Sequence, residues 1–224
     1  MLLSSTLLLR LSRCQPYLFF WDKLNKSNYY LELMIQNPDL PLDGRMMSQL
    51  SQDPTSDGGQ WDMAVNLLEN YGLVPKILYP ESLHSSLSGP LNALLKTKLR
   101  EDALILRRIA ASLRASYVTE EQILITLRSK KEELMSEVYN ILTSTLGTPP
   151  ARDEKFVWEY TDATGKAGRW EGTPIEFYNT FALKPYSVGF CDPLRSSNLR
   201  ARSSLQIHSP SSTIHGTNIP RHIP

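Results

Sequence analysis

Apolar residues recur at helical spacing along most of the first two thirds of the chain. Between residues 16 and 33, aromatic and aliphatic side chains occupy several helical faces, which predicts a helix buried on most sides. A short helix is expected around residues 46–50. A longer one is expected over residues 60–70, and Gly72 is placed to end it in a left-handed conformation. Residues 74–80 begin with Val-Pro and end with Tyr-Pro, so we expect them to be extended.

Two long amphipathic helices follow. Leucine and isoleucine positions three, four and seven residues apart predict a helix over residues 91–116. Residues 119–122, Thr-Glu-Glu-Gln, have the spacing of a capping box and open a second helix, which ends at Gly147 before two prolines. A connection of two or three residues predicts that the two helices form an antiparallel hairpin. We interpret this hairpin as an insertion that can pack on itself.

A short β-hairpin is expected after the helices. Residues 156–160, Phe-Val-Trp-Glu-Tyr, alternate as a strand does, residues 162–168 supply a turn, and the return strand begins near Arg169. Residues 173–176, Thr-Pro-Ile-Glu, form a second capping box with proline at the first helical position, opening a helix to about Leu183. The expected fold class is therefore α+β, mostly helical, with one short β-hairpin.

The two ends of the chain differ from this body. Residues 1–15 are rich in leucine and serine and carry two arginines but no acid, which is the bias of an organellar presequence. A mistaken start codon is the alternative explanation. Residues 188–224 hold seven serines and four prolines and lose the helical periodicity, so we expect a disordered tail or an out-of-frame translation.

Composition and charge limit the classes of function and partner that the sequence supports. There are 24 basic and 23 acidic residues, so overall charge does not indicate a nucleic-acid or membrane partner. No apolar stretch approaches the length of a membrane span. Two distant cysteines, Cys14 and Cys191, make neither a disulfide framework nor a metal cluster and indicate a reducing compartment. Three of the four histidines, His208, His215 and His222, lie in the tail, so little remains for acid–base chemistry at neutral pH, and we assign no metal and no cofactor.

Three local patterns are candidates for chemistry. Cys14 lies near a helix start, but no histidine precedes His84, which lies in a Ser-rich loop, so Cys14 is not expected to be a nucleophile. Gly58 and Gly59 stand before a helix, where paired glycines let another backbone approach in extended form; a plain turn is the alternative. One predicted helix is basic, which indicates a solvated face or, alternatively, a nucleic-acid face. Its charged residues are Lys96, Lys98, Arg100, Arg107, Arg108 and Arg114, against Glu101 and Asp102.

Six sequence runs, in order, resemble bleomycin hydrolase, a family of papain-like cysteine aminopeptidases. They are YLFFWDKL at 17–24, DGGQWDM at 57–63, YGLVPKILYPES at 71–82, LNALLKTKLRE at 91–101, FVWEY at 156–160 and GTPIEFY at 172–178. The resemblance covers about residues 16–187. It implies a papain-like fold, hydrolysis of peptides from the amino end through an acyl-thioester, no cofactor and a cytoplasmic location, with a mitochondrial form in some fungi.

The resemblance assigns substrate binding but no catalytic residue. Gly58 and Gly59 match the double glycine that holds the substrate backbone in papain-like clefts. The family's nucleophile lies in a Gly-x-Cys-Trp context, its histidine precedes alanine, and its asparagine lies in Asn-Ser-Trp-Gly; none of these motifs occurs in this sequence. Cys14 is followed by Gln15 instead of tryptophan and does not map onto the nucleophile. We therefore expect a fragment of the family that misses both ends and is inactive as written.

The resemblance also suggests an organisation and an alternative function. We expect a leader at 1–15, the helical part of the catalytic domain at 16–90, a helical insertion at 91–150, a β-hairpin and helix at 151–187, and the tail at 188–224. The resemblance further implies a hexameric ring with a basic central channel that binds nucleic acid. The alternative is therefore a non-catalytic interaction protein that docks on full-length subunits, or binds nucleic acid weakly, through the helical insertion.

Overall fold

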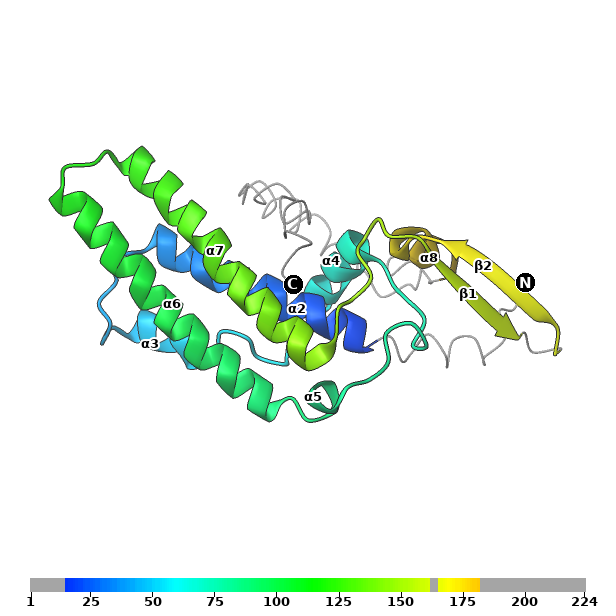
Figure 1. The fold of residues 1–224 in the computed structure, drawn as a ribbon. Coiled ribbons are helices and arrows are strands. Elements are labelled where there is room, and N and C mark those ends of the chain that lie inside the picture. The colour runs from blue at the N-terminus through cyan, green and yellow to red at the C-terminus, as the bar shows by residue number, and fades with distance from the viewer. Residues whose placement is uncertain (1–14, 162–164, 182–224) are drawn as a thin grey trace, which may run out of the picture. The chain divides into compact units, whose positions relative to one another are not determined.

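The computed structural model describes residues 15–161 and 165–181 (Figure 1). They fold into seven helices and one two-stranded sheet. In chain order these are α2 (Gln15–Gln36), α3 (Arg45–Gln52), α4 (Trp61–Tyr71), α5 (Leu83–Ser86), α6 (Gly89–Ala115), α7 (Glu120–Leu146), β1 (Phe156–Thr161), β2 (Ala167–Gly172) and α8 (Pro174–Phe181). None of the helices within the described ranges combines the length and apolar character that a membrane span requires.

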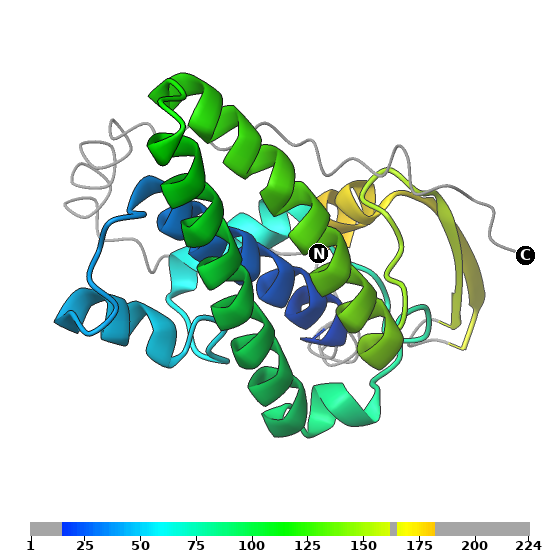
Figure 2. The same cartoon turned by 60° about the vertical axis from the view of Figure 1, so that its left-hand side comes forward.

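The core is built around α2, as its all-round apolar pattern predicted. Its buried residues include Tyr17, Phe20, Leu24 and Leu31, and most of its residues that are not buried are only partly exposed. The helices α6 and α7 run antiparallel and both pack on α2 (Figure 2). The hairpin therefore does not pack on itself alone, because much of the leucine-rich face of both helices is buried against α2. The domain boundaries expected within this part remain a prediction.

The connection between α6 and α7 comprises residues 116–119 and is longer than expected. The N–H of Val118 donates to the carbonyl of Leu113 at 3.2 Å, which closes the end of α6 as in a Schellman motif. This closure places Tyr117 at φ +55°, in the left-handed region that glycine usually occupies. At the other side of the connection, the Thr119 hydroxyl accepts a hydrogen bond from the Gln122 N–H at 3.4 Å and caps α7. This is one half of the predicted capping box; the return bond from the Thr119 N–H to the Gln122 side chain is not formed among the described residues.

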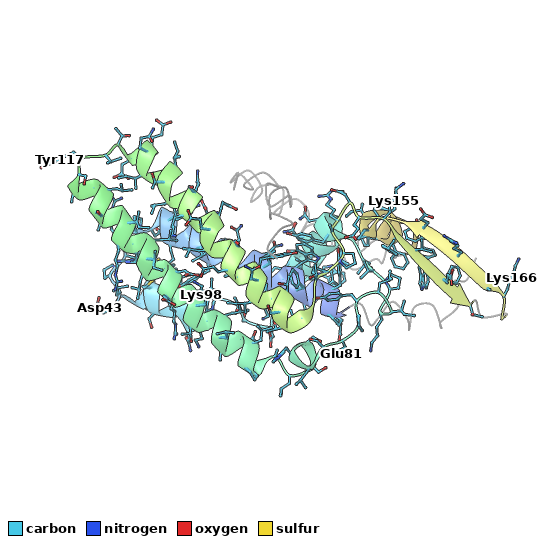
Figure 3. The ribbon with its side chains drawn as sticks, viewed as in Figure 1. Asp43, Glu81, Lys98, Tyr117, Lys155 and Lys166 are labelled. Carbon is cyan, nitrogen blue, oxygen red and sulfur yellow. The ribbon has the colours of Figure 1, made fainter. Side chains whose placement is uncertain are left out.

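Replacing Tyr117 with glycine should stabilise the chain. Tyr117 is 95% exposed and lies at the tip of the helical hairpin (Figure 3), so its side chain contributes little packing. Glycine removes the strain of the positive φ, and we expect about 1 kcal/mol of added stability, measured as a rise in the thermal midpoint. Tyr117→Ala keeps the strain and serves as the control. Equal midpoints for the glycine and alanine variants would contradict this interpretation.

The β-hairpin and α8 form the second part of the core. Strand β1 pairs antiparallel with β2, and Trp158 lies opposite Trp170. Phe177 of α8 is fully buried and contacts both tryptophans, with ring centroids 5.2 Å away in each case. The second capping box is confirmed: Glu176 accepts from the Thr173 N–H at 2.8 Å, and the Thr173 hydroxyl accepts from the Glu176 N–H at 3.3 Å. The predicted α+β class with one short hairpin is confirmed.

The chain between α4 and α5 differs from the expectation in two ways. Gly72 has a positive φ of 74°, but its ψ of −152° is extended instead of left-handed helical, because Leu73 turns to donate its N–H to Pro174 at 3.0 Å. Residues 74–80 are not extended throughout, since the N–H of Leu78 donates to the carbonyl of Pro75 and closes a turn. This turn brings Tyr79 into the core, where its hydroxyl donates to the carbonyl of Gly147 at 3.0 Å.

Candidate functional site

The predicted substrate-binding glycines lie in the loop between α3 and α4, residues 53–60, which we call the glycine loop. Two lysines of α2 form hydrogen bonds with this loop. Lys23 is fully buried, and its ammonium group donates to the carbonyl of Thr55 and to the carboxylate of Asp57, 2.5 Å away. A buried ammonium group is costly unless it is paired and hydrogen-bonded. The loop therefore supplies the partners that Lys23 needs, and Lys23 fixes the loop on the helix.

A second lysine of α2 holds the same loop one turn further on. The Lys26 ammonium group donates to the carbonyls of Ser56, at 2.6 Å, and Gly58, at 2.9 Å, and it pairs with Asp22 at 2.8 Å. Residues three apart share a face of a helix, so Lys23 and Lys26 reach the loop together. The backbone of the loop is thus anchored up to the carbonyl of the first glycine.

Asp57 is the most connected residue of the loop. Besides Lys23, it accepts hydrogen bonds from the Ser88 hydroxyl at 2.6 Å and from the Asn92 amide at 2.9 Å. Partial burial by itself raises the pKa of Asp57, but the hydrogen bonds from Lys23, Ser88 and Asn92 outweigh it and lower the pKa to about 2. Burial lowers the pKa of Lys23, and Asp57 opposes that shift. The site therefore contains a charged carboxylate at neutral pH.

Gly58 faces open space, and Gly59 lies beside the Met63 side chain. A Cβ added to Gly58 would meet no atom within 4 Å, and one added to Gly59 would meet the Met63 sulfur at 3.4 Å. Among the described residues, no hydrogen bond reaches the N–H or the C=O of Gly59. Trp61, which is 62% exposed, and Met63 follow directly at the start of α4. An exposed, unpaired backbone beside apolar side chains can pair with an extended peptide.

The other sequence candidates do not join this loop. His84, expected in a loop, lies in the short helix α5, whose capping box is formed by Ser82 and Ser85. Cys14, Cys191 and the three tail histidines lie outside the described residues, as do most of the leader and the whole tail. Within the described ranges, no three His, Cys, Asp or Glu side chains are grouped so that they could hold a metal ion.

Sequence reasoning proposed the glycines as a candidate site, but it did not predict the residues that hold their loop. Lys23 lies within an apolar run that predicts a buried helix. A lysine in such a run could have indicated a buried charge that needs a partner. Ser88 and Asn92 carry no such signal, because each lies more than 30 residues from Asp57 in the sequence.

Comparison with known proteins shows related sequences over most of the chain. The model of the Peptidase C1-like family matches residues 6–189. Aminopeptidase C of Lactococcus lactis subsp. cremoris is 42% identical over 167 residues, which cover 75% of this chain and 35% of that protein. Cysteine proteinase 1, mitochondrial, of Saccharomyces cerevisiae strain YJM789 is 39% identical over 170 residues, which cover 75% of this chain and 34% of that protein.

A solved structure supports the same relationship. The crystal structure of PepW from Lactobacillus rhamnosis HN001 matches with a TM-score of 0.65 and 41% identity, over 75% of this chain and 35% of that one. The chain thus spans about a third of the length of the relatives that it matches. Sequence and fold agree over the segment that carries the glycine loop, and the chain belongs to the Peptidase C1-like family, as its resemblance to bleomycin hydrolase predicted.

Proposed function

We propose that this chain forms the helical part of a cysteine aminopeptidase and that its Gly58-Gly59 loop binds the backbone of the peptide substrate. The observation that carries the proposal is the open face of Gly58, next to the backbone of Gly59, which is unpaired among the described residues, on a loop anchored by Lys23 and Lys26. Relatives named aminopeptidase and cysteine proteinase support peptides as the substrate class. We take the location to be cytoplasmic, with a mitochondrial location as the alternative that the name of the yeast relative supports.

We expect no peptide hydrolysis from these 224 residues alone. The sequence motifs of the family's nucleophile, histidine and asparagine do not occur in them, so the thiolate–imidazole pair with which the family would form the acyl-thioester is not among these residues. The measurement is turnover of a fluorogenic amino-acid amide by the purified chain, with and without a thiol alkylator. Alkylator-sensitive turnover would contradict this expectation.

Replacing Gly58 with alanine should weaken peptide binding without weakening the fold. The new methyl group meets no atom of the chain within 4 Å, but it projects where a substrate backbone would lie. We expect the dissociation constant of a hexa-alanine peptide to rise about tenfold or more, since a clash costs about 1–3 kcal/mol. The shifts of backbone amide resonances during a peptide titration provide the measurement.

Gly89→Ala is the matched control for this experiment. A Cβ added to Gly89 also meets nothing within 4 Å, and Gly89 belongs to the first turn of α6 and not to the loop. Its peptide affinity should equal that of the parent chain. If Gly58→Ala and Gly89→Ala bind the peptide equally well, the glycine loop is not the backbone-binding site.

The interaction hypothesis receives less support from the geometry. Four of the six basic residues in α6 make polar contacts within the chain, and two of the four are paired with acidic side chains, which reduces the number of cationic groups available to phosphates. These are Lys98 with Glu137, Arg100 with the carbonyl of Ser51, Arg107 with the carbonyl of Leu40, and Arg114 with Asp39. Docking on full-length subunits remains a hypothesis, which co-purification with a full-length relative would test.

A further inference from the structure

Ser88 stands directly before α6 but does not cap it. A serine at this position usually accepts a hydrogen bond from an N–H of the first turn and thereby stabilises the helix. In this structure Ser88 makes no such bond, and its hydroxyl donates to Asp57 at 2.6 Å. The side chain is therefore used to hold the glycine loop instead of the helix that it precedes.

Asn92 acts on the same carboxylate from one turn further along α6. Its amide nitrogen lies 2.9 Å from each carboxylate oxygen of Asp57. Residues four apart share a helix face, so Ser88 and Asn92 approach Asp57 together. Hydrogen bonds to a charged group are stronger than neutral ones, and the start of a helix favours a carboxylate. Asp57 is thus bound firmly to the first turn of α6.

Asp57 directly precedes the glycines and is therefore hydrogen-bonded to two helices at once. Lys23 reaches it from α2, while Ser88 and Asn92 reach it from α6. Without the bonds from α6, the loop would be held from α2 alone, by Lys23 and by the Lys26 bonds to Ser56 and Gly58.

We propose that Ser88, Asn92 and Asp57 are positioning residues, which fix Gly58 and Gly59 for the substrate backbone and so couple the α6–α7 hairpin to substrate binding. The inference rests on the proposed function of the glycine loop. Its consequence is that the helical hairpin contributes to the substrate site through the side chains of Ser88 and Asn92.

The test is backbone dynamics of the two glycines. In the Ser88→Ala/Asn92→Ala double variant of the full 224-residue chain, we expect the amide order parameters of Gly58 and Gly59 to fall from about 0.85 to below about 0.6. Asp57→Asn is avoided because it leaves the buried Lys23 without a counter-charge. Ser88→Thr, which retains the hydroxyl, should keep the parent order parameters. Ser116→Ala, at the opposite end of α6, removes a hydroxyl that donates to the carbonyl of Ser112, and it is the control.

Peptide affinity is measured in parallel on the same variants. The double variant should bind a hexa-alanine peptide about tenfold more weakly, and Ser88→Thr should bind it as the parent does. Unchanged order parameters in the double variant would overturn the positioning role, whatever the affinity. If the parent chain binds no peptide but the order parameters still fall in the double variant, then Ser88 and Asn92 do position the loop, and the proposed peptide-binding function of the loop is wrong.

Discussion

Replacing Gly72 with alanine is expected to destabilise the chain by about 2–6 kcal/mol. The backbone at this position has φ +74°, which strains any residue with a side chain by about 1–3 kcal/mol. An added Cβ would also lie 2.2 Å from the carbonyl oxygen of Pro174, and relieving that overlap costs about 1–3 kcal/mol more. The neighbour is backbone at the start of α8, so it cannot move aside as a flexible side chain can.

The measurement is thermal unfolding followed by circular dichroism. For a chain of this size, the expected loss lowers the midpoint by about 5–20 °C. Gly89→Ala is the matched control, because the same change at an open helical glycine should leave stability unchanged or raise it slightly. A Gly72→Ala midpoint equal to that of Gly89→Ala would show that the close approach to Pro174 is not required.

Gly72 also shows how far sequence reasoning reaches. A glycine after an apolar helix predicts that the helix ends there, and α4 does end at Tyr71. The conformation of Gly72 was not predictable, because it depends on Leu73 bonding to Pro174, about a hundred residues later. Local signals indicated, to within a few residues, where the long helices begin and end, although they missed α5. A distant contact determined the backbone at the cap of α4.

The helical hairpin and the candidate site show the same contrast between local signals, which the sequence reveals, and distant contacts, which it does not. Periodicity predicted both long helices, but packing on α2 depends on partners such as Glu32 and Lys131, which are 99 residues apart. At the site, paired glycines are a local signal, so Gly58 and Gly59 could be proposed from the sequence. Ser88 and Asn92 could not, since nothing in an ordinary helix start shows which distant carboxylate it will bind.

Replacing Glu32 with glutamine is expected to destabilise the chain by about 3 kcal/mol. The Lys131 side chain is only 2% exposed, and its ammonium group lies 2.7 Å from the carboxylate of Glu32, between α7 and α2. Removing one charge of a buried pair leaves the other unpaired, which costs about 3–5 kcal/mol. The lower end applies because the amide oxygen of glutamine still accepts one hydrogen bond. The free energy of unfolding in urea is the measurement.

Glu133→Gln is the matched control, because the Lys130–Glu133 pair on the same helix is exposed and should contribute less than about 1 kcal/mol. If Glu32→Gln and Glu133→Gln lose equal free energy of unfolding, the Glu32–Lys131 pair does not stabilise the fold as a buried pair would.

The pair also predicts how stability depends on pH. Partial burial alone raises the pKa of Glu32, but hydrogen bonds from Lys131 and Arg128 outweigh it, so the folded-state pKa is lowered below 4.5. The contribution of Glu32 is then complete above pH 4.5 and is lost as the pH falls through the lowered folded-state pKa. Because the glutamine of the Glu32→Gln variant does not titrate, the difference in stability between parent and variant should shrink in that acid range and stay constant at neutral pH. A difference independent of pH down to about 2 would mean that the charge of Glu32 does not stabilise the fold.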